Sequence, residues 1–212
     1  MFHACIKYLL ITGSVTSFSV AEPTAHDITK NTQRRLDGIT SLSANFILAS
    51  HLSVLDQAGE STGRLFLVRD PNKLRLEQES HTIVSDGESV WTYVPKNQQI
   101  IVSPMEPSGG MRPDEFLFYY ARHYTPKLKG TETIGGIKHY ILELIANDGK
   151  AQLERVTVLV DNNSWLTRKV QYVDDMESST TISFSDIRLN PRLPEETFVI
   201  VVPEGVEVVD LR

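Results

Sequence analysis

The chain has 212 residues, of which 41% are hydrophobic and 23% are charged. This length and apolar content fit a single domain with a sizeable core. The formal net charge is −6, from 27 acidic and 21 basic residues. Such a balance argues against nucleic-acid binding, which needs a basic surface, and against electrostatic docking on anionic lipid.

Residues 1–21 have the pattern of a secretory signal. Lys7 precedes an apolar stretch, and residues 19–21 read Ser-Val-Ala, a small-x-small cleavage pattern. We expect cleavage after Ala21, so that residues 22–212 form one mature domain. The apolar stretch is too short, and too interrupted by Gly, Ser and Thr, for a membrane-spanning helix.

The only cysteine, Cys5, lies inside this signal and before its apolar stretch. The mature chain therefore has no thiol for a disulfide, a nucleophile or a metal site. No cysteine follows the apolar stretch, where a lipid-attachment cysteine would stand. We expect a soluble, unlipidated protein in an envelope compartment, most simply a bacterial periplasm.

The first predicted element is a helix from Asp27 to about Ile39, opened by a weak capping box between Thr24 and Asp27. From Leu42 the apolar period changes to two, which predicts a long half-buried strand reaching Val54. Later strands are predicted at 63–69, 73–78, 99–103, 127–134, 138–145, 153–160, 166–173, 177–188, 198–202 and 206–209.

Residues 83–94 predict a hairpin, because an Asp-Gly pair at 86–87 separates two apolar runs. A two-residue turn would pair Ile83 with Val90. Both faces of the hairpin would be largely apolar. Ile83, Val90 and Thr92 would lie on one face, and Val84, Trp91 and Tyr93 on the other.

The middle of the chain differs from the rest. Residues 104–113 hold three prolines and an adjacent pair of glycines, which predicts a mobile loop. Residues 114–124 then predict a short helix with an apolar stripe that includes Phe116, Leu117 and Tyr120. The whole pattern is mainly β, with about eleven meandering strands and two or three short helices. It favours one antiparallel sheet that curls.

No catalytic or metal-binding pattern is apparent. The six histidines never fall at metal-ligand spacing, and there is no nucleophile elbow or phosphate-binding glycine loop. Asp186 on a strand has no base or metal partner, and Asp174 and Asp175 adjoin in a turn. We therefore expect a binding or structural protein with no cofactor, not an enzyme.

Several segments together resemble the periplasmic outer-membrane lipoprotein carrier (LolA-like) family. They are Phe46, the run 63–68, the run 71–76, the block 84–95 with its Val-Ser-Asp-Gly and Trp-Thr-Tyr, and the closing 198–210. The resemblance implies an unclosed antiparallel barrel, whose hydrophobic cavity is covered by short helices acting as a lid. It also implies a ligand, the acyl chains of bacterial lipoproteins. These would arrive from an inner-membrane ABC lipoprotein-release complex and leave to an outer-membrane lipoprotein acceptor, with the carrier a monomer.

Members of this family commonly carry an Arg, thought to contact the lid, just before the proline that follows the second strand. Here Asp70 stands at that place and Arg69 precedes it. Strand parity would put Phe66, Val68 and Asp70 on the face of Leu74 and Leu76, with Arg69 pointing away. We call the residue that holds the lid by such a contact the lid latch. Three alternatives stay open: Asp70 is the latch, Arg75 takes its place, or the protein has no latch.

The alternating patterns select candidate cavity residues in the sheet. They are Phe46, Leu48, Phe66, Val68, Leu74, Leu76, Ile83, Val90, Ile182 and Phe184, with Phe116, Leu117 and Tyr120 as lid candidates. Plain core packing is the competing interpretation for each of them. Two other functions stay open: an envelope sensor or regulatory domain on the same fold, and a carrier of another lipid.

Overall fold

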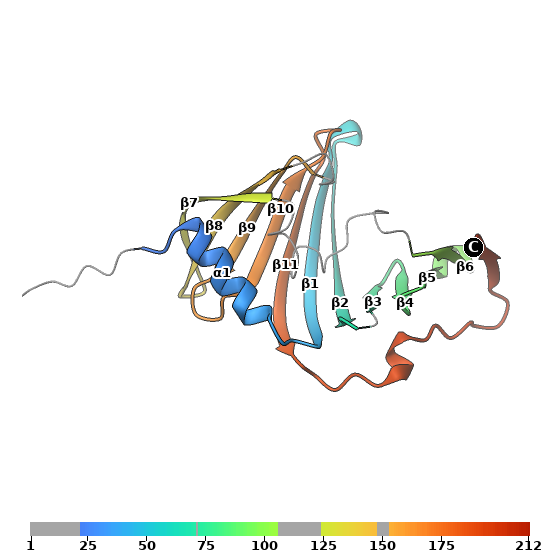
Figure 1. Cartoon of the computed structure of the whole chain (residues 1–212). Coiled ribbons are helices and arrows are strands. Elements are labelled where there is room, and N and C mark those ends of the chain that lie inside the picture. The colour runs from blue at the N-terminus through green and yellow to red at the C-terminus, as the bar shows by residue number, and fades with distance from the viewer. Residues whose placement is uncertain (1–21, 71, 106–123, 148–152) are drawn as a thin grey trace, which may run out of the picture.

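A computed structural model describes residues 22–70, 72–105, 124–147 and 153–212. The predicted signal, with its cleavage site, and the lid candidates Phe116, Leu117 and Tyr120 lie outside these residues. The described chain is mainly β, with one curled, unclosed sheet of 12 strands (Figure 1). The strands are β1 (Ser41–Leu52), β2 (Gln57–Val68), β3 (Lys73–Gln78), β4 (Thr82–Ser85), β5 (Ser89–Val94), β6 (Gln99–Pro104), β7 (Tyr124–Ile134), β8 (Ile137–Ala146), β9 (Arg155–Asp161), β10 (Thr167–Val173), β11 (Ser179–Leu189) and β12 (Glu207–Asp210).

The sheet order is β12-β6-β5-β4-β3-β2-β1-β11-β10-β9-β8-β7. Two meanders, β1 to β6 and β7 to β11, join where β1 pairs with β11. The predicted meander is therefore confirmed, with 12 strands where the sequence indicated about eleven. The strand predicted at 206–209 is β12, which pairs with β6 in parallel rather than antiparallel fashion.

The single described α-helix, α1 (Ala25–Leu36), covers part of this sheet (Figure 1). Thr24 and Asp27 form the predicted capping box, since the Thr24 hydroxyl accepts from Asp27 N while the Asp27 carboxylate accepts from Thr24 N. Ile28 and Leu36 are buried in the same cluster as the strands. A helix with a polar exterior is thus anchored by an apolar stripe at helical spacing.

The tight turn between β7 and β8 is the two-residue hairpin that its glycines predict. Ile134 pairs with Ile137, and the intervening Gly135 and Gly136 have φ of 58° and 79°. Two consecutive positive φ values are the signature of a type I′ turn, which glycine adopts without strain.

The hairpin of β4 and β5 has a different register from the predicted one. Ser85 pairs with Val90 and Ile83 pairs with Thr92, so the connection is two residues longer on one side. The Asp86 carboxylate accepts from the backbone N–H groups of Glu88 and Ser89, at 2.9 Å each, and so closes a wider loop. Because the register error is two residues, the predicted division into two faces is nevertheless right.

The C-terminal segment crosses the outside of the sheet. Its predicted strand at 198–202 is wrong: Phe198 ends a 3₁₀ turn, η5 (Glu195–Phe198), and residues 199–206 are not in a strand. Phe198 is buried, and Arg75 donates to the carbonyls of Thr197 and Val199 at 3.3 Å. A salt bridge between Lys73 and Glu195 adds a second tie.

Candidate functional site

The sheet has an apolar inner face, which we define by its cross-strand partners, because directly paired residues of neighbouring strands share a face. One row runs Leu42, Leu67, Leu74, Ser85 and Val90. Three more rows lie parallel to it. They are Ala44-Leu65-Leu76-Ile83-Thr92, Phe184-Phe46-Gly63 and Leu142-Val158-Val170-Ile182-Leu48.

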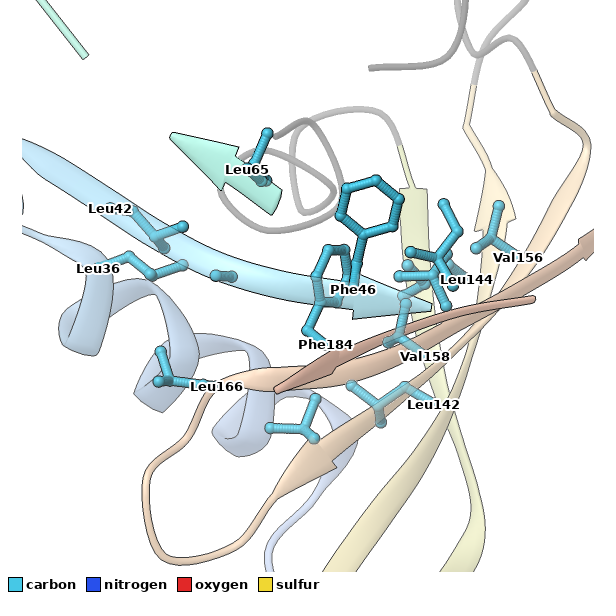
Figure 2. Packing of buried hydrophobic residues seen from close by; sticks show 14 of the residues in the cluster. Leu36, Leu42, Phe46, Leu65, Leu142, Leu144, Val156, Val158, Leu166 and Phe184 are labelled. Atoms are coloured by element: carbon cyan, nitrogen blue, oxygen red, sulfur yellow. The ribbon is translucent and has the colours of Figure 1, made fainter. Parts of the chain in front are cut away.

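The inner face is densest in the middle of the sheet. Phe46 and Phe184 pair across β1 and β11 and point into one cluster with Leu144 and Val158 (Figure 2). There Leu142, Leu144 and Val158 have no exposed surface, and the two phenylalanines are only 3% and 5% exposed. This part of the face is a packed core.

On β4 and β5 the inner face carries Ile83 and Val90 beside Ser85 and Thr92, and these two apolar side chains are less deeply buried than those of the central strands. Ile83 packs against the central cluster and yet, like Val90, is only half-buried. Leu74 and Leu76 on the neighbouring strand are each 7% exposed. The apolar surface therefore grades from a packed core to a partly open margin within one sheet.

Eight of the ten predicted cavity residues lie on this inner face. They are Phe46, Leu48, Leu74, Leu76, Ile83, Val90, Ile182 and Phe184. Ile83 and Val90 lie on this inner face, and Trp91 and Tyr93 lie on the outer face.

The placement of Phe66 and Val68 with Leu74 is wrong. Phe66 pairs with Arg75, and Val68 pairs with Lys73, so both point outward. The residues that accompany Leu74 and Leu76 are Leu67 and Leu65, which sequence reasoning missed. Residues 65–68 are all apolar, so the alternation of apolar and polar residues could not decide whether the even-numbered or the odd-numbered positions point inward.

Phe66 lines a different hollow, on the outer face. This cavity of about 530 Å³ lies between β2 to β5 and the C-terminal segment, beside Arg75, Glu77 and Tyr93. Its charged lining makes it a poor site for acyl chains. Among the described residues, no cluster of three His, Cys, Asp or Glu could hold a metal ion. In the same part of the chain, no helix has the length and apolar character needed to span a bilayer.

Arg69 contacts helix α1 and the residue segment that follows it, a contact that the sequence did not predict. Its Nη1 donates to the carbonyls of Leu36 and Ile39, at 3.0 and 3.4 Å, at the C-terminal end of α1. With Leu65 and Leu67 on the inner face, Arg69 follows them in the same alternation, so the expectation that it points away is wrong. A one-residue error in the predicted alternation of β2 explains both the wrong placement of Phe66 and Val68 and the wrong direction of Arg69.

The two latch candidates from the sequence, Asp70 and Arg75, stay predictions, because the lid candidates lie outside the described residues. Asp70 is exposed in the turn before β3. Arg75 lies on the outer face, where it binds Glu77 and the C-terminal segment. Neither residue reaches the inner face from there, whereas Arg69 carries positive charge to the negative end of the α1 dipole.

Replacing Arg69 with Ala is expected to destabilise the fold by about 2 kcal/mol, because charge-assisted hydrogen bonds to the carbonyls of Leu36, at the end of α1, and of Ile39 are lost. Urea unfolding of the two proteins measures the difference. Asp70→Ala is the matched control, since Asp70 is adjacent and exposed. An equal loss in both variants would contradict the anchoring role.

The turn between β9 and β10 is held by a buried carboxylate, Asp161. Burial alone would raise the pKa of Asp161, but hydrogen bonds from the N–H groups of Ser164 and Asn163, with Arg168 nearby, lower that pKa from its ordinary value. A lowered pKa in the folded state gives stability that is present above the unfolded pKa and is lost as pH falls through the folded value.

Asp161→Asn is therefore expected to cost about 1–3 kcal/mol at neutral pH. The variant should also lose part of the destabilisation that we expect of the parent as pH falls through the lowered pKa of Asp161. Thermal melts of both proteins at a series of pH values measure this. Parallel pH profiles would show that Asp161 does not contribute.

Comparison with known proteins places this architecture in a family. An uncharacterized protein of Methanocaldococcus jannaschii is 24% identical over 212 residues, which cover 97% of this chain but only 60% of that protein. An outer-membrane lipoprotein carrier protein of Legionella pneumophila is 25% identical over 209 residues, covering 96% of this chain and 98% of the relative. One from Methylobacillus flagellatus is 29% identical over 200 residues, covering 82% and 90%.

Among solved structures, an uncharacterized conserved protein from Thermus thermophilus shares the fold. Its TM-score is 0.59 at 13% identity, and the match covers 88% of this chain and 98% of that one. The model of the family described as outer membrane lipoprotein carrier protein LolA matches residues 37–201, well over half of the sequence. The chain thus belongs to the outer-membrane lipoprotein carrier (LolA) family.

Proposed function

We propose that this chain is a periplasmic carrier that binds the acyl chains of lipoproteins on its inner face and ferries them from the inner to the outer membrane. The observation that carries the proposal is the apolar margin at Ile83 and Val90, which continues the core yet is only half-buried. Covering half-exposed apolar surface with hydrocarbon removes it from water, which lowers the free energy and so favours binding. Membership of the carrier family supports the same conclusion.

The size of the hydrophobic effect explains why such cargo needs a carrier. Each methylene moved out of water is worth about 0.8 kcal/mol, so three chains with about 14 buried methylenes each total roughly 30 kcal/mol. A carrier must cover most of this surface and still release it. A partly open apolar margin meets both needs better than a fully packed core does.

The proposed lining consists of the inward residues of the sheet. It keeps the eight inward residues predicted from the sequence, and Leu65 and Leu67 take the places of Phe66 and Val68. Phe116, Leu117 and Tyr120 remain a lid prediction from the sequence.

The remaining parts of the proposal follow from carrier function. The protein is a binding protein without catalysis, working as a monomer in the periplasm after cleavage behind Ala21. An inner-membrane ABC lipoprotein-release complex supplies its cargo, and an outer-membrane lipoprotein acceptor receives it. The relatives' name, outer-membrane lipoprotein carrier protein, supports a lipoprotein as the cargo.

Native mass spectrometry of the protein purified from a periplasmic fraction tests the proposal. The expected species begins at Glu22 and carries a tri- or diacylated lipoprotein. A different co-purified lipid would favour a carrier of another amphiphile. A signalling protein as the bound species, without acylated cargo, would favour an envelope sensor.

A further inference from the structure

Two neighbouring hairpins at one end of the sheet expose large apolar side chains. Leu52, Val54 and Leu55 belong to the β1–β2 hairpin and are 45%, 77% and 68% exposed. Val173 and Met176 belong to the β10–β11 hairpin and are 59% and 70% exposed. We call these five side chains the apolar tip.

The two hairpins form one surface. β1 pairs with β11 up to His51 and Ser179, directly before the turns, and Ser53 N donates to Ser178 Oγ at 3.3 Å. Figure 1 shows the two turns close together at the upper end of β1 and β11. Residues distant in sequence are thereby presented side by side.

Both turns are built by internal hydrogen bonds and need no apolar packing. In the β1–β2 turn, Asp56 N donates to Ser53 O and the His51 ring contacts the Asp56 carboxylate at 3.1 Å. In the β10–β11 turn, Asp174 Oδ1 accepts from the N–H groups of Met176 and Ser178, at 2.9 Å each. The exposed apolar side chains therefore contribute little to the fold, which leaves recognition as their use.

Charge narrows the choice of what binds there. Residues 50–60 and 172–180 contain five acidic side chains, Asp56, Glu60, Asp174, Asp175 and Glu177, and no Lys or Arg. An anionic membrane would repel this rim. A second copy docked tip to tip by two-fold symmetry would set acid against acid.

We propose that the apolar tip is a docking knob for a different protein, whose surface carries an apolar recess rimmed by Lys or Arg side chains. Five apolar side chains cover less than the area of a permanent interface, so the contact is transient. The proposal does not depend on which cargo the inner face holds.

The absence of cysteine after residue 21 allows a direct test, because a single introduced thiol can carry a photocrosslinker. The mature chain with benzophenone at Val54→Cys or at Met176→Cys is irradiated with solubilised envelope proteins. Ile134→Cys is the control, since Ile134 is in the β7–β8 hairpin at the opposite end of the sheet. The expected result is the same adduct from both tip positions and none from the control.

The captured protein is then purified, and its binding to the mature chain is measured. Two variants are compared: V54S/L55S/M176S, and the charge reversal D175K/E177K, which leaves the turn-forming carboxylate of Asp174 in place. Each should weaken binding about tenfold or more, the loss expected from removing a central apolar anchor or its complementary charge. Binding should also weaken as ionic strength rises, while Tm changes little.

Four results would overturn the proposal. Adducts from position 134 as well as from the tip exclude a specific docking surface, and so does the absence of adducts from the two tip positions. Adducts of the chain with itself identify a second copy as the occupant. Flotation with phosphatidylcholine vesicles that the serine variant abolishes identifies a membrane surface instead.

Discussion

Exchanging Ile83 for Glu is expected to reduce acyl-chain binding by roughly a hundredfold or more while the chain stays folded. The side chain of Ile83 points to the inner face and is only half-buried, so a carboxylate there can keep part of its hydration in the empty protein. Covering that carboxylate with hydrocarbon costs about 3 kcal/mol or more, which corresponds to the stated loss. Displacement of a fluorescent fatty acid, together with thermal melting, measures both properties.

The matched control is Val68→Glu. Val68 is also β-branched and half-buried on a strand, but it points to the outer face opposite Lys73, which would pair with the new carboxylate. We expect Val68→Glu to bind acyl chains like the parent protein. Equal loss in both variants would mean that the inner face has no special role. Leu74 is a poorer position for this test, because it is 7% exposed and a carboxylate there would threaten the fold.

The sheet could be predicted from the sequence because its local signals agree with one another. β1 alternates between apolar and polar residues from Leu42 to Phe46, and the pairs Asp86-Gly87 and Gly135-Gly136 indicate the positions of the two hairpins. A glycine that can adopt positive φ predicts a turn from the neighbouring residues alone, and a period of two over many residues predicts a strand in the same way. These signals require no knowledge of the partner strands.

The inner-face assignment failed where local signals were ambiguous. Residues 65–68 read Leu-Phe-Leu-Val, so either frame buries two apolar side chains. The choice is made by the turn after Val68, in which Asn72 adopts a φ of 59° and Val68 pairs with Lys73. A one-residue change in that connection would reverse both faces, and with them the direction of Arg69.

The error in the β4–β5 register had no such effect. Asp86 closes the loop by accepting from two backbone N–H groups, which extends the turn beyond the Asp-Gly pair. The register moves by two residues, and Ile83 and Val90 stay on the inner face. The parallel pairing of β12 with β6 lies beyond local reasoning altogether, because it joins residues about a hundred positions apart.

Replacing Gly63 with Ala is expected to destabilise the protein by about 3 kcal/mol, at the upper end of overpacking costs. A Cβ built at Gly63 would lie 2.3 Å from the Phe46 ring and 2.4 Å from the backbone oxygen of Glu77. The ring could rotate away, but the oxygen belongs to the β3 backbone, so relief requires the strand to move. The corresponding fall in Tm is about 6–12 °C for a chain of this size.

Gly59→Ala is the matched control for this substitution. Gly59 lies on the same strand, and its added Cβ would meet only Ser50 Oγ, at the ordinary contact distance of 3.8 Å. We expect its Tm to remain within a few degrees of the parent value, since a compatible Gly→Ala change also restricts the unfolded chain. Similar losses in both variants would indicate a general intolerance of β2 rather than a specific contact.

A double-mutant cycle separates the two contacts of Gly63. Phe46→Leu shortens the side chain that covers the glycine, so its cost and that of Gly63→Ala should combine less than additively, by about 1 kcal/mol. Full additivity would assign the whole clash to the β3 backbone at Glu77. Less-than-additive costs of the two substitutions would mean instead that the missing side chain at Gly63 makes room for the Phe46 ring beside Phe184. Acyl binding by Gly63→Ala, measured below its melting transition, should then fall as well, because the displaced ring disturbs the inner face.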